Sequence, residues 1–269
     1  MRFENVTGAI AGLVSFLFLA APAQAVLQGT PLKEPDGLRR SVVAVESGDG
    51  ELCSGALVAP DLVLTAAHCL TDRVAYRIVG VDRGFRKQSV RVAAIAVHPT
   101  FVPGTTPRTQ PGVDLALLKL ERPLGGDFGP FDLRTAGGIA EGEMVTVAGF
   151  GVSSERVKSS ARTLRQVQLL AVGNVEVANR VVIATDRTRL AETAGAGACR
   201  GDSGGPVLVT SQGGYRLSGI VSWSSGALRA NGPNACGGLT AITSLREHMN
   251  WIRQATSSLD GMAESWARR

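Results

Sequence analysis

Cys199-Arg200-Gly201-Asp202-Ser203-Gly204-Gly205-Pro206 is a polar turn that combines a hydroxyl, a carboxylate and three glycines. A serine hydroxyl is a weak nucleophile at neutral pH, so Ser203 needs a base, an orienting acid and an oxyanion site supplied by other parts of the chain. A solvated glycine-rich loop has the same composition. The stretch alone therefore leaves both interpretations open.

One of the three histidines is a candidate base. His68 follows the apolar run 62–67 and precedes Cys69, a pattern that predicts a buried strand entering a short helical turn. A buried structural histidine would fit the same place. We interpret His98, which precedes a proline, and His248, in a polar surface segment, as structural.

Asp114 is the candidate orienting acid. It begins the apolar run 114–120, directly after the proline-containing loop 101–112. Buried carboxylates are rare unless they are paired, so an aspartate at the start of such a run points to a partner. An aspartate that only caps the end of a loop is the alternative.

Three motifs occur in a characteristic order along the chain. Thr65-Ala66-Ala67-His68-Cys69 comes first, Asp114-Leu115-Ala116-Leu117 second and Gly201-Asp202-Ser203-Gly204-Gly205-Pro206 third. In order and spacing they resemble the chymotrypsin/trypsin-like serine peptidase family, and the similarity extends over nearly all of the chain after residue 25. We expect a secreted, bacterial-type member.

The resemblance implies a mechanism, because the Ser-His-Asp template is that of this family. Ser203 would attack the scissile carbonyl, His68 would transfer its proton, and Asp114 would hold the imidazole. The N–H groups of Gly201 and Ser203 would form the oxyanion hole. It further implies an endopeptidase that acts on protein or peptide substrates as a monomer, without a cofactor or a metal.

The nucleophile-elbow pattern of the α/β-hydrolases is a rival, because Gly201-x-Ser203-x-Gly205 also satisfies it. In that fold the acid and the histidine follow the serine. After Ser203 the only histidine is His248, and its neighbour Glu247 points about 100° away on a helix. The chain order therefore favours the peptidase.

The four cysteines predict disulfides, since an exported chain of this size commonly contains them. Of the three pairings that are open, the resemblance selects Cys53 with Cys69 and Cys199 with Cys236. No two cysteines have the close spacing of a zinc ligand pair, so we expect no metal site.

Residues 1–25 have the pattern of a signal peptide. Arg2 is followed by an apolar core from Ala9 to Ala21 and by the small-x-small sequence 23–25. The core is short for a membrane span. We expect a secreted or periplasmic protein without a stable membrane anchor after cleavage; a retained anchor is the alternative.

Cleavage after Ala25 would expose Val26. Residues 26–29 resemble the mature start of the family, with Gln28 as a departure, and in the family this terminal ammonium pairs with the residue that corresponds to Asp202. A buried ion pair with one partner missing costs several kcal/mol. We expect signal cleavage itself to activate the enzyme; cleavage elsewhere, or a retained signal and an inactive chain, are the alternatives.

Short β-branched runs separated by turn residues predict an all-β fold. The resemblance implies two six-stranded antiparallel β-barrels in the peptidase domain, residues 26–255, with the active site in the cleft between them and the crossing near 125–142. We expect a C-terminal helix near 244–254 and a C-terminal tail over 256–269 that is disordered or contacts a partner.

The resemblance also indicates the substrate pocket. Gly197 occupies its base, where a carboxylate would select lysine or arginine. Ser222, Trp223 and Ser224 would form one wall and Gly238 the other, although Trp223 could equally be a core residue. We expect a neutral pocket for small or medium apolar side chains.

Charge does not indicate a nucleic-acid partner. The net charge is +5, and the arginines are scattered without an aromatic-basic patch. The functional alternative is a catalytically silent homologue that acts as a binding module. Such homologues usually lack a triad member, whereas this chain has all three.

Overall fold

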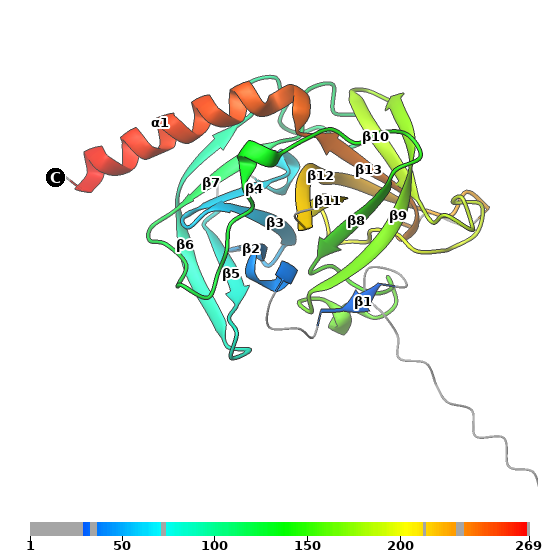
Figure 1. Ribbon diagram of the computed structural model, residues 1–269, viewed down its shortest axis with the longest axis horizontal. Helices are drawn as coiled ribbons and strands as arrows, with labels where there is room; N and C mark the ends of the chain where they lie inside the picture. Colours follow the sequence, from blue (N-terminus) through cyan, green and yellow to red (C-terminus); the bar gives the residue numbers. More distant parts are fainter. Residues whose placement is uncertain (1–28, 33–36, 71–73, 212–213, 230–233, 268–269) are drawn as a thin grey trace, which may run out of the picture.

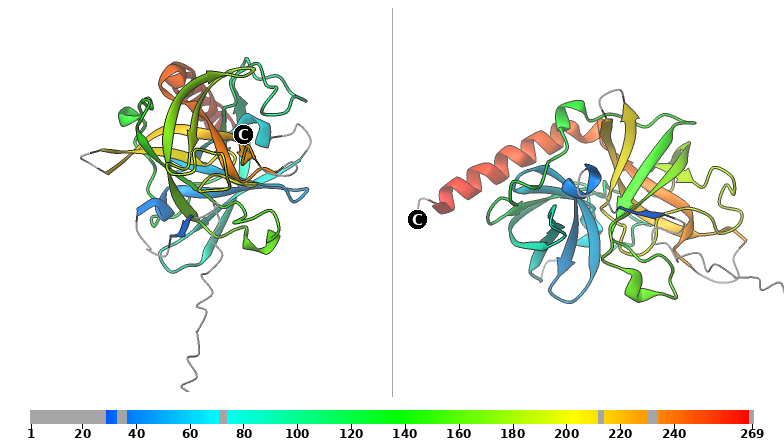
Figure 2. Two further views of the ribbon diagram at one scale, coloured as in Figure 1. Left: turned by 90° about the vertical axis from the view of Figure 1, so that its right-hand side faces the viewer. Right: turned by 60° about the horizontal axis from the view of Figure 1, so that its bottom comes forward.

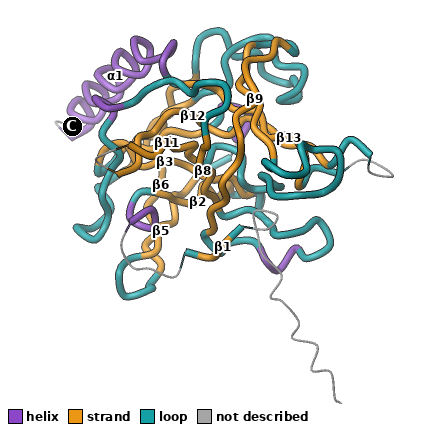
Figure 3. The backbone as a smooth tube through the Cα atoms, turned by 45° about the vertical axis from the view of Figure 1, so that its right-hand side comes forward, coloured by secondary structure: helices purple, strands orange, loops and turns teal. Residues whose placement is uncertain are grey.

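The computed structural model describes residues 29–32, 37–70, 74–211, 214–229 and 234–267. Two antiparallel β-barrels lie side by side, and a long helix lies on the outside of the first (Figures 1 and 2). The predicted all-β fold of two six-stranded barrels is confirmed. Figure 3 shows how far strands dominate over helices.

The first barrel closes in the strand order β2-β3-β4-β7-β6-β5. Its strands are β2 (Val42–Ser47), β3 (Leu52–Ala59), β4 (Leu62–Thr65), β5 (Tyr76–Val81), β6 (Lys87–Val97) and β7 (Ala116–Leu120).

The second barrel closes because β8 pairs with both β9 and β11. Its strands are β8 (Met144–Gly149), β9 (Arg165–Glu176), β10 (Arg180–Thr185), β11 (Pro206–Ser211), β12 (Gly214–Gly226) and β13 (Gly237–Ser244). The two-residue strand β1 (Thr30–Pro31) pairs with β9, Thr30 opposite Gln166. The segment 121–143, which includes the predicted crossing, connects the barrels.

Each barrel has its own apolar interior, and a further cluster joins the barrels to the helix. Successive side chains of a strand point to opposite faces of the sheet. On β9, Val167, Leu169 and Ala171 are accordingly buried, while Gln168 is exposed. The joining cluster includes Leu117 of β7, Leu208 of β11 and Ile252 of the helix. The barrels therefore share a buried apolar contact that keeps the cleft between them in shape.

Short 3-10 helices punctuate the loops: η1 (Gly37–Arg40), η2 (Ala67–Cys69), η3 (Leu133–Thr135), η4 (Lys158–Ser160) and η5 (Arg246–His248). The helix α1 (Met249–Ala267) follows η5 directly. None of the helices in the described part of the chain is long and apolar enough to cross a membrane.

The helix differs from the prediction at both ends. Ser244 still belongs to β13, and α1 continues through most of the segment that the sequence predicts as a tail. Ile252, Ala255 and Leu259 are buried on one face, as their spacing of three and four residues allows. Beyond them, the carboxylate of Asp260 lies 2.6 Å from the ammonium nitrogen of Lys119 on β7. Docking on the first barrel thus supports the helix beyond the end that the sequence predicts.

Candidate active site

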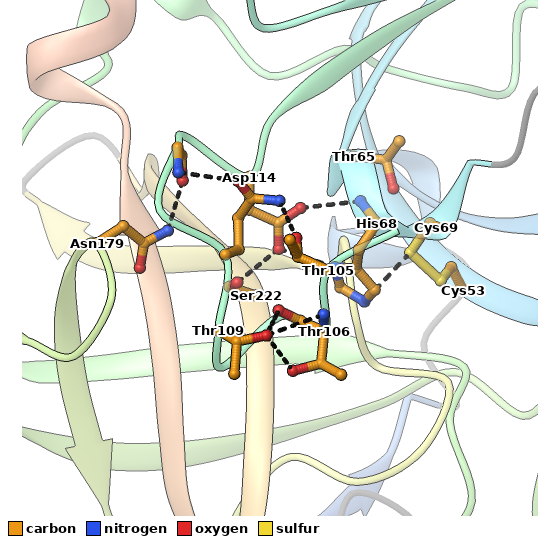
Figure 4. Close-up of polar contacts among 12 residues, drawn as sticks. Cys53, Thr65, His68, Cys69, Thr105, Thr106, Thr109, Asp114, Asn179 and Ser222 are labelled. Carbon is orange, nitrogen blue, oxygen red and sulfur yellow. Dashed lines mark hydrogen bonds and ion pairs between the residues drawn. A yellow bond between two sulfur atoms is a disulfide. The ribbon is translucent and has the colours of Figure 1, made fainter. Parts of the chain in front are cut away.

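Strand pairing brings His68 and Asp114 together. His68 lies on η2 just after β4, Asp114 lies just before β7, and Thr65 of β4 is opposite Ala116 of β7. Asp114 Oδ2 is 2.8 Å from His68 Nδ1, and Asp114 Oδ1 accepts a 2.9 Å hydrogen bond from the His68 backbone N–H (Figure 4). The carboxylate therefore holds both the backbone and the ring of the histidine.

The electrostatics favour an ionised Asp114. The residue is fully buried, and the hydroxyl of Ser222 on β12 donates a 2.5 Å hydrogen bond to Oδ2. Burial by itself would raise the pKa of this carboxyl, but the His68 ring and the Ser222 hydroxyl outweigh it, and the pKa is lowered. An ionised acceptor at Nδ1 leaves Nε2 of a neutral ring as the nitrogen that can accept a proton.

The nucleophile loop, residues 199–205, is shaped by its glycines. Gly204 has φ +80°, and a Cβ there would lie 2.1 Å from Thr65 Oγ1 and 2.3 Å from Ser54 O. Gly201 has φ +93°, in the left-handed region that favours glycine. Close approach to the first barrel therefore excludes a side chain at Gly204, and the backbone conformation favours glycine at Gly201.

Two backbone N–H groups of this loop are available. Within the described residues, the N–H groups of Gly201 and Ser203 donate no hydrogen bond, whereas the Gly204 N–H donates to Val221 O at 2.8 Å and the Gly205 N–H to Asp202 O at 2.9 Å. Free N–H groups beside a hydroxyl can stabilise a developing oxyanion.

Ser203 and His68 line one cavity of about 330 Å³, which we call the histidine-side cavity. Across the described part of the chain, no hydrogen bond joins Ser203 Oγ to His68 Nε2; the sulfur of Cys69 lies 3.9 Å from that nitrogen. Nucleophile and base are commonly loose in free enzymes and tighten when substrate binds.

A second cavity, of about 410 Å³, lies on the other side of Ser203, and we call it the tryptophan-side cavity. Ser222, Trp223 and Ser224 line it, and the Ser224 hydroxyl donates to Ala235 O at 2.6 Å.

Gly197 and Gly238, which were expected in the substrate pocket, are not among the residues that line this cavity. They pack against backbone instead: a Cβ on Gly197 would lie 3.1 Å from Gly237 Cα, and one on Gly238 would lie 2.0 Å from Gly226 O. The strand segments around the expected pocket therefore approach each other closely.

Both expected disulfides, Cys53–Cys69 and Cys199–Cys236, are present. The first lies next to His68, and the second joins the nucleophile loop to the segment that precedes β13. Cys53, His68 and Cys69 bring three metal-ligand atoms close together. The two sulfurs are bonded to each other, so they cannot act as thiolate ligands.

Asp202 is completely buried and points away from solvent. Its carboxylate accepts 2.9 Å hydrogen bonds from the N–H groups of Gly151 and Cys199. Burial raises the pKa of Asp202 to about 7, although these hydrogen bonds and the charge of Arg165 act in the opposite direction. Val26, its expected partner, and the expected signal peptide lie outside the described residues.

Three residues near the site were not singled out from the sequence. Ser54 on β3 contacts the nucleophile loop, Arg108 lies over Trp223, and Glu155 accepts a 2.6 Å hydrogen bond from the Ala235 N–H. The position of Arg108 in the loop before Asp114 is a signal that could have drawn attention to it. Ser54 and Glu155 become prominent only through contacts with distant segments.

The two-barrel fold and the arrangement around Ser203 define a class of serine hydrolase. The family model described as Trypsin matches residues 32–252. The chain belongs to the trypsin family of serine peptidases, whose members act on protein or peptide substrates.

Individual relatives agree with this assignment. The chain is 30% identical over 251 residues to vitamin K-dependent protein C of Mus musculus, covering 86% of this chain and 52% of that protein. It is also 30% identical over 228 residues to trypsin alpha-4 of Lucilia cuprina, covering 81% and 82%. The chain thus spans about half the length of the protein C sequences of mouse and rat. The solved structure of neuropsin, a serine protease of mouse brain, has the same fold, with a TM-score of 0.66 at 23% identity over 86% of this chain and 99% of that one.

Proposed function

We propose that this protein is a serine endopeptidase that hydrolyses peptide bonds through an acyl-enzyme intermediate. The observation that carries the proposal is the network of Ser222, Asp114 and His68 at the edge of a cavity that also contains Ser203. A buried carboxylate held by a hydroxyl and by an imidazole is the arrangement that orients a general base.

In the proposed reaction, Ser203 Oγ adds to the scissile carbonyl carbon while its proton moves to His68 Nε2. The carbonyl oxygen becomes an oxyanion that accepts hydrogen bonds from the N–H groups of Gly201 and Ser203. Collapse of this intermediate breaks the C–N bond, and the amine leaves with the proton from Nε2. Water then releases the acyl group by the same steps, with His68 again as base and acid, and Asp114 stabilises the imidazolium each time.

Activation by Val26 belongs to the same proposal. The Asp202 carboxyl is buried and accepts hydrogen bonds from two backbone N–H groups. Among the described residues it forms no ion pair, and only the charge of Arg165 acts on it from a distance. An ammonium from the new N-terminus would neutralise this charge and hold the adjacent peptide of Ser203 in place. N-terminal sequencing of the exported protein tests it, and a start other than Val26 contradicts it.

For substrate preference we propose small or medium apolar side chains at the residue that supplies the scissile carbonyl. Gly197 offers no carboxylate, and the close approach of Gly238 to the Gly226 backbone leaves little depth. Cleavage-site profiling with a mixed peptide library tests this preference. A dominant cleavage after lysine or arginine would contradict it.

Export to the periplasm or the medium, a monomeric state and the absence of a membrane anchor after cleavage are further parts of the proposal. Export depends on the signal-like residues 1–25 and on the two disulfides, which favour an oxidising compartment. A bacterial origin has no support from the relatives reported above, which come from Mus musculus and Lucilia cuprina.

A fluorophosphonate probe tests the chemistry directly. We expect the probe to label the exported protein at Ser203, and we expect a Ser203→Ala variant to remain unlabelled. Absence of labelling in correctly processed protein, together with absence of peptide hydrolysis, would favour the catalytically silent binding module instead.

A further inference from the structure

Arg108 extends from the first barrel across the cleft to the second. Its guanidinium carbon lies 5.0 Å from the centre of the Trp223 ring, and its Nη2 donates a 3.2 Å hydrogen bond to the carbonyl of Ser224. Arg108, Trp223 and Ser224 line the tryptophan-side cavity together with Ser203. An arginine of the loop before Asp114 thus covers part of the surface beside the nucleophile.

The turn that carries Arg108 is held in shape. The Thr109 N–H donates to Thr106 O at 3.0 Å, and the Thr106 N–H donates to Thr109 Oγ1 at 3.1 Å (Figure 4). Gln110, which is fully buried, donates a 2.9 Å hydrogen bond to Val102 O. These contacts fix the base of the turn, so the guanidinium is presented to the cavity from a defined position.

The charge of Arg108 is not neutralised. Within the described residues it forms no ion pair, whereas Arg200, which lines the same cavity, lies 3.4 Å from the carboxylate of Glu155. The described residues that line the cavity include these two arginines and no aspartate or glutamate. The electrostatic potential in the tryptophan-side cavity therefore favours an anionic occupant.

Chemistry determines which half of a substrate enters this cavity. In the proposed function, on which this step rests, His68 protonates the leaving amine, so the leaving half lies in the histidine-side cavity. The acyl half then extends into the tryptophan-side cavity, past Ser222, Trp223 and Ser224.

The strand edge in that cavity can bind an extended peptide. β11 pairs with β12 only as far as Ile220, whereas β13 pairs with β12 as far as Gly226. Peptides commonly add to such an edge through backbone hydrogen bonds. Arg108 reaches the Ser224 carbonyl from the cleft and occupies an acceptor that an added strand would use.

We infer that Arg108 is a specificity-determining residue that selects substrates with an acidic side chain shortly before the scissile bond. A peptide strand that takes the Ser224 carbonyl displaces the guanidinium from its acceptor. A glutamate or aspartate of that strand replaces the lost contact with a charge-assisted pair, while the stacking on Trp223 is retained. A neutral side chain at the same position offers no such replacement.

Matched peptides test the inference. One series places Glu at each of the four positions before the scissile bond, a second places Gln at the same positions, and kcat/KM is measured at low and high salt. We expect wild-type protein to prefer Glu at one position by about fivefold, and the preference to decrease with salt. Arg108→Gln should lower the Glu/Gln ratio of kcat/KM to about one, whatever its effect on the Gln peptides taken alone.

Arg122→Gln is the matched control, because Arg122 is an exposed arginine just after β7 that lines neither cavity. It removes the same charge and should retain the Glu preference. Equal loss of the preference in both variants, or a ratio of one in the wild type, would overturn the inference.

Binding separates this inference from the proposed function. The Ser203→Ala variant should bind the Glu peptide more tightly than the Gln peptide, and Ser203→Ala/Arg108→Gln should not. If no peptide is hydrolysed by wild type but this binding difference exists, the endopeptidase proposal fails and the inference stands. If the Gln peptides are hydrolysed and no difference appears in rate or binding, the inference fails and the proposed function stands.

Discussion

The Ser54 hydroxyl on β3 donates a 2.8 Å hydrogen bond to the carbonyl of Gly201, 147 positions further along the chain. The Ser54 backbone N–H donates to Ser203 O at 2.8 Å, and its hydroxyl accepts from the Phe150 N–H at 2.9 Å. One fully buried residue of the first barrel thus contacts the nucleophile loop on both sides of Asp202. The geometry of the proposed oxyanion site depends on both barrels.

Ser54→Ala should weaken both stability and turnover. It leaves the Gly201 carbonyl and the Phe150 N–H without their partner, which lowers the free energy of unfolding by about 1–3 kcal/mol. Because the Gly201 carbonyl lies between the two proposed oxyanion donors, the N–H groups of Gly201 and Ser203, kcat should decrease as well. Urea unfolding and steady-state kinetics measure the two effects.

Ser218→Ala is the control for this variant. Ser218 is also fully buried, and its hydroxyl donates to the nearby Arg216 O at 3.4 Å, in the second barrel. It should lose stability without a comparable decrease in kcat. If Ser54→Ala retains as much of its kcat as Ser218→Ala does, Ser54 does not position the nucleophile loop.

His68→Ala and Ser203→Ala should each lower kcat by about 10⁴-fold or more, and the double variant should lose little beyond either single one. The two groups act on the same proton, so removing one makes the other ineffective. Active-site titration and kcat for all three variants measure this. Additive losses would mean that His68 and Ser203 do not act as a unit.

Asp202 should make the chain with an uncleaved N-terminus less stable as pH rises from about 4 to about 7. Its pKa is raised from 3.8 to about 7 by burial, so in this window the unfolded state is ionised and the folded state still holds the proton. The contribution of Asp202 to the free energy of unfolding is complete below pH 3.8 and is lost as the pH rises through about 7. Urea unfolding from pH 4 to pH 8 measures the decrease.

Two proteins serve as controls for the Asp202 effect. Asp202→Asn in the uncleaved chain should remove this decrease, because the amide does not titrate. Protein that begins at Val26 should also lack it, because the ammonium favours the ionised carboxylate. A decrease that persists after cleavage would contradict the proposed pair.

His98 should make the protein less stable as pH decreases, which is opposite to the effect of Asp202. Its ring lies 5.4 Å from that of His248 and 4.9 Å from that of Trp251, at the junction of β6 with the start of α1. Burial, with the charge of His248 adding to it, lowers the pKa of His98 from 6.5 to about 4. Between these values the unfolded state binds the additional proton, so stability should fall as pH decreases from about 6.5 to about 4.

His98→Phe should flatten this part of the stability profile, as measured by urea unfolding of both proteins in the same buffers. His98 Nδ1 contacts Thr100 Oγ1 at 3.0 Å, so Thr100→Val serves to separate the loss of that contact from the loss of the titrating ring. An unchanged slope in His98→Phe would show that another group is responsible.

Much of this protein follows from short stretches of its sequence. The order of the motifs around His68, Asp114 and Ser203 indicates the family, and the resemblance to that family implies the disulfide pairs. Local patterns are sufficient to identify the family and the candidate catalytic residues. The reason is that each motif combines a reactive side chain with the glycines or apolar residues that its own turn or strand requires. Gly204 illustrates this, since any side chain there would collide with Thr65 and Ser54.

Other features depend on contacts between segments that are far apart in the chain. The packing of α1 against the first barrel and the ion pair of its Asp260 with Lys119 join distant segments, and His98 meets His248 because α1 docks beside β6. Arg108 looks like one of many scattered arginines until the fold places it over Trp223. The groups that can perform the chemistry are therefore visible in local motifs, because each motif has its own local geometry. The surroundings of these groups follow from the fold, because burial, charge pairing and strand-edge exposure arise when distant segments pack together.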